Sequence, residues 1–141
     1  MLRTIACAAV ALSACSALGQ NPRLGGSMMH LLVSLDDSTV NIEFETDPQG
    51  PLSLQNYGET YSGAASVLNG TSYNAQFGWL AGGFISLPPD SGIFVEPVSM
   101  TNGLSIHDAF SFAPIMGTDG SDTVWQWGGL MTHPWVATRR P

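Results

Sequence analysis

Apolar and polar residues alternate in two neighbouring segments of the first third of the chain. The apolar positions of the first segment are Leu31, Val33 and Leu35, and those of the second are Val40, Ile42 and Phe44. A period of two is typical of a strand with one face on the core. Asp36, Asp37 and Ser38 stand between the segments and favour a turn. The pattern therefore predicts a hairpin that buries Val40, Ile42 and Phe44.

The same alternation returns in residues 71–79, and shorter apolar runs follow it to the end of the chain. These runs lie at 84–87, 93–98, 104–107, 109–116, 123–127 and 131–137, with a further short run at 52–56. Turn-forming Gly, Pro and Asp separate them, and only residues 64–68 could equally be a helical turn or a strand. We expect an all-β fold, an antiparallel β-sandwich or jelly roll of about seven to ten short strands. We expect residues 20–141 to form a single domain of this fold.

The first nineteen residues have the layout of a secretory signal peptide. Arg3 supplies a positive start, residues 4–16 are small and apolar, and Ala17 to Gly19 resemble a cleavage site. We expect the exported protein to begin at Gln20. The alternative is a lipobox ending at Cys15, which would anchor the protein to a membrane through a lipid. Either reading predicts a secreted, periplasmic or cell-surface protein, and no other apolar run is long enough to span a membrane.

The charge and the cysteine content reduce the number of function classes that fit this chain. The chain has 4 basic and 11 acidic residues and a formal net charge of −7, which would repel nucleic acid. Both cysteines, Cys7 and Cys15, lie within the signal, so the exported domain has no disulfide. Its stability has to come from packing, to which 6 Phe, 4 Trp and 3 Tyr contribute.

Three stretches resemble exported bacterial proteins, some of which carry a PEP-CTERM-type sorting tail. These stretches are residues 82–89, 112–118 and 125–133. The resemblance implies placement at the cell surface or outside the cell, and it implies no reaction. This chain has no Pro-Glu-Pro motif or final apolar helix, and ends on Arg139, Arg140 and Pro141 after a strand-like segment. The C-terminus is therefore either a short tail or a truncation.

Trp125, Gln126 and Trp127 are the candidate ligand-binding residues. In a strand, residues two apart lie on the same face about 7 Å from each other. Two such rings can form a platform on which sugar rings stack, with Gln126 as a polar neighbour. The same spacing also arises when both rings fill a core between two sheets.

The histidines offer an alternative, a metal site. His30, His107, His133 and Met131 combine imidazole with thioether, the ligands that copper accepts. Isolated histidines are more often packed or surface residues. Calcium is a further alternative at the acidic turns Asp36-Asp37 and Asp119 to Asp122, although tight turns favour Asp and Gly for backbone reasons alone.

Enzyme signatures are weak. Glu43 and Glu45 share a strand face, as two hydrolytic carboxylates would, and His107-Asp108 could belong to a triad with a distant serine. A solvated strand face explains the glutamates equally well. We therefore predict a non-enzymatic structural, adhesive or binding module whose partner is a polysaccharide or another protein. An exported metal-binding protein is the second hypothesis, and a small secreted hydrolase is the third.

Overall fold

A computed structural model describes residues 21–37, 39–45 and 51–139 of the 141-residue chain. The predicted signal at residues 1–19, with Cys15, lies outside the described residues, as do Arg140 and Pro141. The described residues form eight strands and one short 3-10 helix, η1 (Gly63–Leu68). The strands are β1 (Met29–Asp36), β2 (Thr39–Phe44), β3 (Thr71–Asn74), β4 (Phe77–Ala81), β5 (Ile93–Val95), β6 (Leu104–His107), β7 (Trp125–Trp127) and β8 (Trp135–Arg139).

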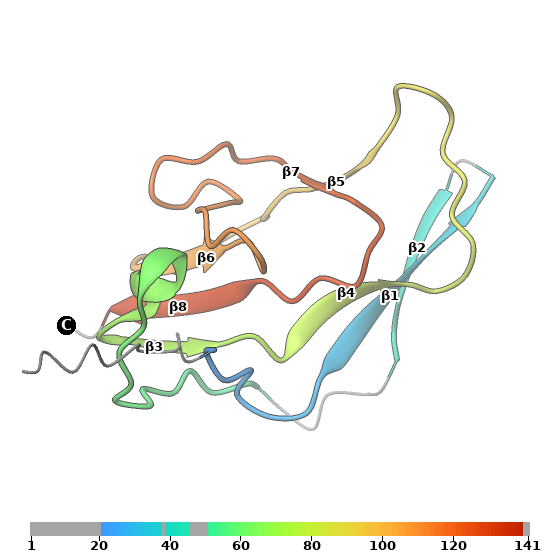
Figure 1. Cartoon of the computed structure of the whole chain (residues 1–141). Coiled ribbons are helices and arrows are strands. Elements are labelled where there is room, and N and C mark those ends of the chain that lie inside the picture. Colours follow the sequence, from blue (N-terminus) through green and yellow to red (C-terminus); the bar gives the residue numbers. More distant parts are fainter. Residues whose placement is uncertain (1–20, 38, 46–50, 140–141) are drawn as a thin grey trace, which may run out of the picture.

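The strands form three small open sheets (Figure 1). Their orders are β2-β1-β4, β3-β8-β6 and β5-β7. The prediction of an all-β protein is thus confirmed, and open sheets of this kind fit a sandwich. One pairing differs from the expected antiparallel pattern, because β1 and β4 run parallel. That pairing brings residues 29–33 beside residues 77–81, which are far apart in the sequence.

The predicted hairpin is β1 and β2, which pair antiparallel from Leu31 with Phe44 to Asp36 with Thr39. Asp37 takes a left-handed conformation at the turn, with φ of 52°. The predicted burial of the β2 apolar face is wrong, since Val40, Ile42 and Phe44 are 44%, 59% and 51% exposed. The reason is position: β2 is the edge strand, and the core forms one strand further in, at Val33.

One core cluster lies where β3 and β8 meet η1. Tyr61, Leu68, Tyr73, Trp135 and Ala137 are buried there. The rings of Tyr73 and Trp135 meet edge to face, with centroids 5.8 Å apart, and Phe112 stacks on Trp135 at 5.4 Å. Burial of these large aromatic rings removes apolar surface from water and so stabilises this part of the fold.

A second core cluster packs the β5-β7 ribbon against the first sheet. Val33 of β1, Ile93 of β5 and Trp127 of β7 are its buried members, with Trp79 and Trp125 packed beside them. The centroids of the Trp79 and Trp125 rings lie 5.4 Å apart. This cluster fixes β7 in place, and with it all three candidate ligand residues.

Several short segments differ from the sequence-based expectation. Residues 71–79 are two strands rather than one, because the Asn74 side chain accepts a hydrogen bond from the amide of Gln76 and the chain passes from one sheet to another. Residues 64–68 belong to the 3-10 helix η1. Residues 84–87 form no strand, and Phe84 is 93% exposed. Within the part of the chain that the structure describes, no helix has the length and apolar character needed to cross a membrane.

Candidate functional site

Two histidines meet on the first sheet. His30 lies in β1 opposite Gly78 of β4, and Trp79 bridges to Thr132, which places His133 on the other side of Gly78. The Nε2 atoms of His30 and His133 are 3.1 Å apart, and the ring planes meet at 73°. The sheet thus joins two side chains that are separated by 103 positions in the sequence.

Gly78 makes room for this pair. A Cβ atom added to Gly78 would lie 2.8 Å from two ring carbons of His133 and 2.6 Å from the carbonyl oxygen of Thr132. Any side chain here would have to displace the ring or the backbone. Because Gly78 has no side chain, the imidazoles of His30 and His133 can meet above β4, the strand between them.

Each imidazole is held by its other nitrogen. Nδ1 of His133 lies 3.0 Å from the carbonyl oxygen of Ala75, and Nδ1 of His30 lies 2.5 Å from Oε2 of Glu45. The amide of Glu45 also donates to the carbonyl of His30, so the two residues are paired through main chain and side chain. Both rings are mostly covered, with 11% of the His30 side chain and 8% of His133 exposed.

Burial affects the charge of His133. Removal from water lowers the pKa of the His133 imidazole, the hydrogen bond to Ala75 opposes this shift, and nearby His30 lowers the pKa further. The neutral ring is therefore the favoured form of His133 near pH 7.

His107, a third predicted metal ligand, lies elsewhere. It belongs to β6 in the second sheet, where Nδ1 is 3.2 Å from the carbonyl oxygen of Phe112 and Nε2 is 3.1 Å from the hydroxyl of Ser105. Burial lowers the pKa of its imidazole. His107 therefore lies in a different sheet from His30, and its ring nitrogens contact Phe112 and Ser105 rather than His30 or His133.

The structure therefore does not bring the four predicted metal ligands together at one place. Met131, the fourth predicted ligand, is 48% exposed two residues before His133. Among the described residues, no group of three or more His, Cys, Asp or Glu side chains is arranged to hold a metal ion. The His30–His133 pair is what remains of the predicted site.

Two of the residues considered for a hydrolase, Asp108 and Glu45, make hydrogen bonds to neighbouring residues of the fold. Asp108 does not turn toward His107: its Oδ1 accepts hydrogen bonds from the amides of Phe110 and Ser111 and from the Ser111 hydroxyl. Burial raises the pKa of this carboxyl, but those hydrogen bonds outweigh burial and the net shift is downward. Glu45 pairs with His30, and Glu43 is exposed on β2.

The three candidate ligand residues on β7 do not form one surface. Trp127 is only 2% exposed, and its indole N–H donates to the carbonyl of Leu130. Trp125 is half-buried against Trp79, and Gln126 is exposed. Trp127 is thus a core residue in this structure, which leaves Trp125 and Gln126 available to a ligand.

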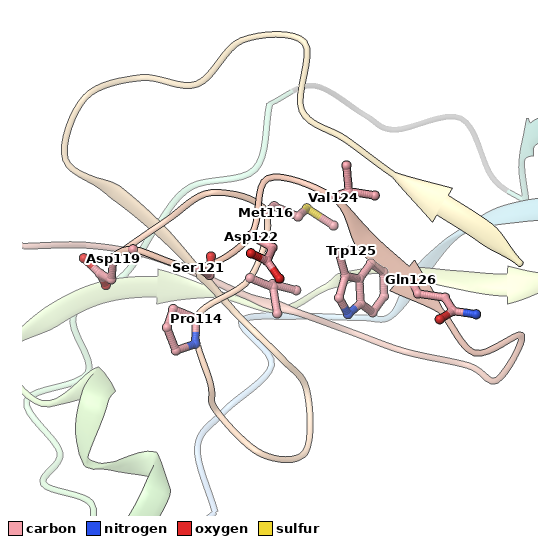
Figure 2. Close-up of a pocket in the computed structure, with 10 residues that line it drawn as sticks. Pro114, Met116, Asp119, Ser121, Asp122, Val124, Trp125 and Gln126 are labelled. Carbon is pink, nitrogen blue, oxygen red and sulfur yellow. The ribbon is translucent and has the colours of Figure 1, made fainter.

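Trp125 and Gln126 line an open pocket of about 480 Å³. Figure 2 shows Met116, Asp122 and Trp125 around it, with Gln126 further along β7 and Asp119 at the opposite end. The acidic segment closes on itself, since the amide of Gly117 donates to the carbonyl of Asp122 and that of Ser121 to the carbonyl of Thr118. Asp and Gly at residues 119–122 therefore serve the backbone of a tight turn, which is the explanation of this segment that does not require calcium.

Sequence reasoning missed the contribution of Gly78, the link from Glu45 to His30, and Ser105 beside His107. The first two depend on the register between strands, which alternation within one strand does not reveal. A Ser two residues before a His on one strand was the available signal for the third.

No protein-family model, curated protein or solved structure matches this chain.

Proposed function

We propose that this protein is an exported, non-enzymatic binding module that pairs with an extended segment of another protein through the outer edge of β2. The observation that carries the proposal is that all six residues of this edge strand are exposed. Three of them are the large apolar side chains Val40, Ile42 and Phe44. Among the described residues no strand pairs with the outer side of β2, and a partly apolar edge of this kind is a template for the addition of a strand.

The backbone of β2 is suited to such pairing. The amide of Glu45 donates inward to His30, and the register of β2 with β1 is continuous. Because antiparallel strands alternate inward and outward amides, the amides of Val40, Ile42 and Phe44 face away from β1. A partner strand would find donors and acceptors along that edge.

The side chains indicate the chemistry of the partner. One face of β2 is apolar and the other carries Thr39, Asn41 and Glu43, in a chain with a formal net charge of −7. A segment that alternates apolar with basic residues would match both faces. A second copy of this chain would bring the same net charge of −7 to this edge and is disfavoured by repulsion.

A pair of synthetic peptides tests this proposal. The probe is a ten-residue peptide of alternating Lys and Val, and its counterpart alternates Glu and Val. Fluorescence anisotropy should detect binding of the basic peptide only. N-methylation of its Val residues should abolish binding, since these residues lie opposite Val40, Ile42 and Phe44 and their amides pair with β2. Ile42→Lys should weaken binding at least tenfold, while Leu130→Lys, which alters an exposed apolar residue away from β2, should not. Equal binding of the methylated peptide would overturn the proposal.

Carbohydrate binding at the Trp125 pocket is a second candidate function. The half-buried indole and the polar groups of Gln126, Asp122 and Asp119 line one opening, a combination that suits a sugar ring. A glycan array should then show signal that Trp125→Ala and Gln126→Ala both remove. Absence of signal from the wild-type protein would eliminate this candidate.

A further inference from the structure

We propose that the facing Nε2 atoms of His30 and His133 bind a late first-row transition-metal ion such as Zn²⁺ or Cu²⁺. This inference is independent of partner binding at β2. It depends on the direction in which the two rings present their free lone pairs.

The hydrogen bond of His133 fixes the position of its proton. A carbonyl oxygen can only accept, so the contact from Nδ1 to Ala75 requires the ring proton on Nδ1. In the neutral ring, Nε2 then carries a lone pair and no hydrogen. Imidazole bound to metal through Nε2 commonly has its Nδ1–H on a backbone carbonyl in this way.

His30 is oriented in the same sense by a carboxylate. Its Nδ1 lies 2.5 Å from Oε2 of Glu45, an acceptor, so the proton again sits on Nδ1. In the neutral ring this leaves a carboxylate–histidine pair whose Nε2 lone pair points toward His133, the arrangement that makes an imidazole a stronger metal ligand.

Two lone pairs that face each other at 3.1 Å repel unless a positive charge lies between them. Nitrogens at that separation, each about 2.0–2.1 Å from one ion, subtend about 95–102° at the ion, which is between square-planar and tetrahedral geometry. A small adjustment of either ring would therefore seat the ion. The competing occupant is a proton shared by the two rings.

The surroundings favour a fixed pair of ligands. The missing side chain at Gly78 lets the His133 ring pack directly against β4. His30 lies within β1, and His133 directly follows Thr132, whose backbone bridges to Trp79 of β4. Two imidazoles leave the remaining coordination positions to water, so the ion would be exchangeable. Borderline divalent ions bind imidazole more strongly than Ca²⁺ or Mg²⁺, which select oxygen ligands.

The test uses tag-free protein treated with a chelator and then titrated with ZnCl₂ at about pH 7.5. Isothermal titration calorimetry should show one bound ion. His30→Gln and His133→Gln should each weaken binding at least tenfold. His107→Gln is the matched control, because both nitrogens of that ring already have partners. Glu45→Gln should weaken binding by about 10–100-fold.

A spectroscopic measurement covers the case in which a variant fails to fold. In wild-type protein labelled with ¹⁵N at histidine, Zn²⁺ should shift the Nε2 resonances of His30 and His133 and leave those of His107 unchanged. With Cu²⁺, the electron paramagnetic resonance spectrum should show coupling to two nitrogens. Absence of Zn²⁺ binding to the wild type, or equal shifts at His107, would overturn the proposal and leave the shared proton.

Discussion

Gly78 and His133 are packed so closely that Gly78 has no space for a Cβ atom, which would lie 2.8 Å from the imidazole and 2.6 Å from the Thr132 carbonyl oxygen. Gly78→Ala should therefore force the segment at Thr132 away from β4. We expect a loss of about 1–3 kcal/mol in the free energy of unfolding, as for other overpacked sites. Urea denaturation followed by tryptophan fluorescence measures this loss.

Gly128→Ala is the matched control for Gly78→Ala. No atom lies within 4 Å of a Cβ placed on Gly128, so this change should leave the free energy of unfolding nearly unaltered. Equal losses in the two variants would mean that the contact between Gly78 and His133 does not limit packing.

Trp127 should contribute more to stability than Trp125. Trp127 is 2% exposed, and its indole N–H donates a hydrogen bond to the carbonyl oxygen of Leu130. Trp127→Ala should therefore cost about 3–5 kcal/mol in the free energy of unfolding. Trp125 is only half-buried, so Trp125→Ala should cost less. Chemical denaturation of both variants measures the two losses. A larger loss for Trp125→Ala than for Trp127→Ala would contradict the placement of Trp127 in the second core cluster.

Local pattern was enough to predict the β1–β2 hairpin, because a strand signal and a turn signal adjoin in the sequence. It did not predict that Val40, Ile42 and Phe44 are exposed. Alternation shows which residues share a face, whereas burial depends on what covers that face. The covering residues belong to β4, β5 and β7, and they reach Val33 of β1 but leave β2 at the edge.

The histidine pair could be predicted only in part. Sequence analysis named both His30 and His133 as potential ligands, but it grouped them with His107 on composition alone. Whether they meet depends on the parallel pairing of β1 with β4 and on the bridge from Trp79 to Thr132. Contacts between such distant segments carry no local signal, since each segment is a satisfactory strand in many arrangements.

The buried hydroxyl pair of Tyr61 and Tyr73 should contribute measurably to stability. The hydroxyl oxygens are 2.5 Å apart, and Tyr61 donates to Glu59, so Tyr73 must donate to Tyr61. Burial, followed by the hydrogen bonds to Glu59 and Tyr73, raises the pKa of Tyr61 and keeps it protonated. Tyr73→Phe should therefore cost about 0.5–1.5 kcal/mol in the free energy of unfolding. A thermal transition unchanged from wild type would contradict this.

His107 should make the protein less stable in mild acid. Burial lowers the pKa of its imidazole below the ordinary 6.5, and the hydrogen bond to Phe112 offsets only part of that shift. As the pH falls below about 6.5, the unfolded chain binds a proton at this position before the folded protein does, so the free energy of unfolding decreases. The contribution is complete above that pH and disappears as the pH falls toward the pKa of the folded state.

Comparison of wild type with His107→Gln isolates this effect from other titrating groups. Urea denaturation at about pH 7.5, 6.5 and 5.5, with a chelator present, should show a steeper loss of stability for wild type than for the variant. Only the slopes matter, since the substitution can change the stability at every pH by a constant amount. Parallel slopes would mean that the folded and unfolded states protonate His107 alike, which is incompatible with a ring that is 5% exposed and bonded to Phe112 and Ser105.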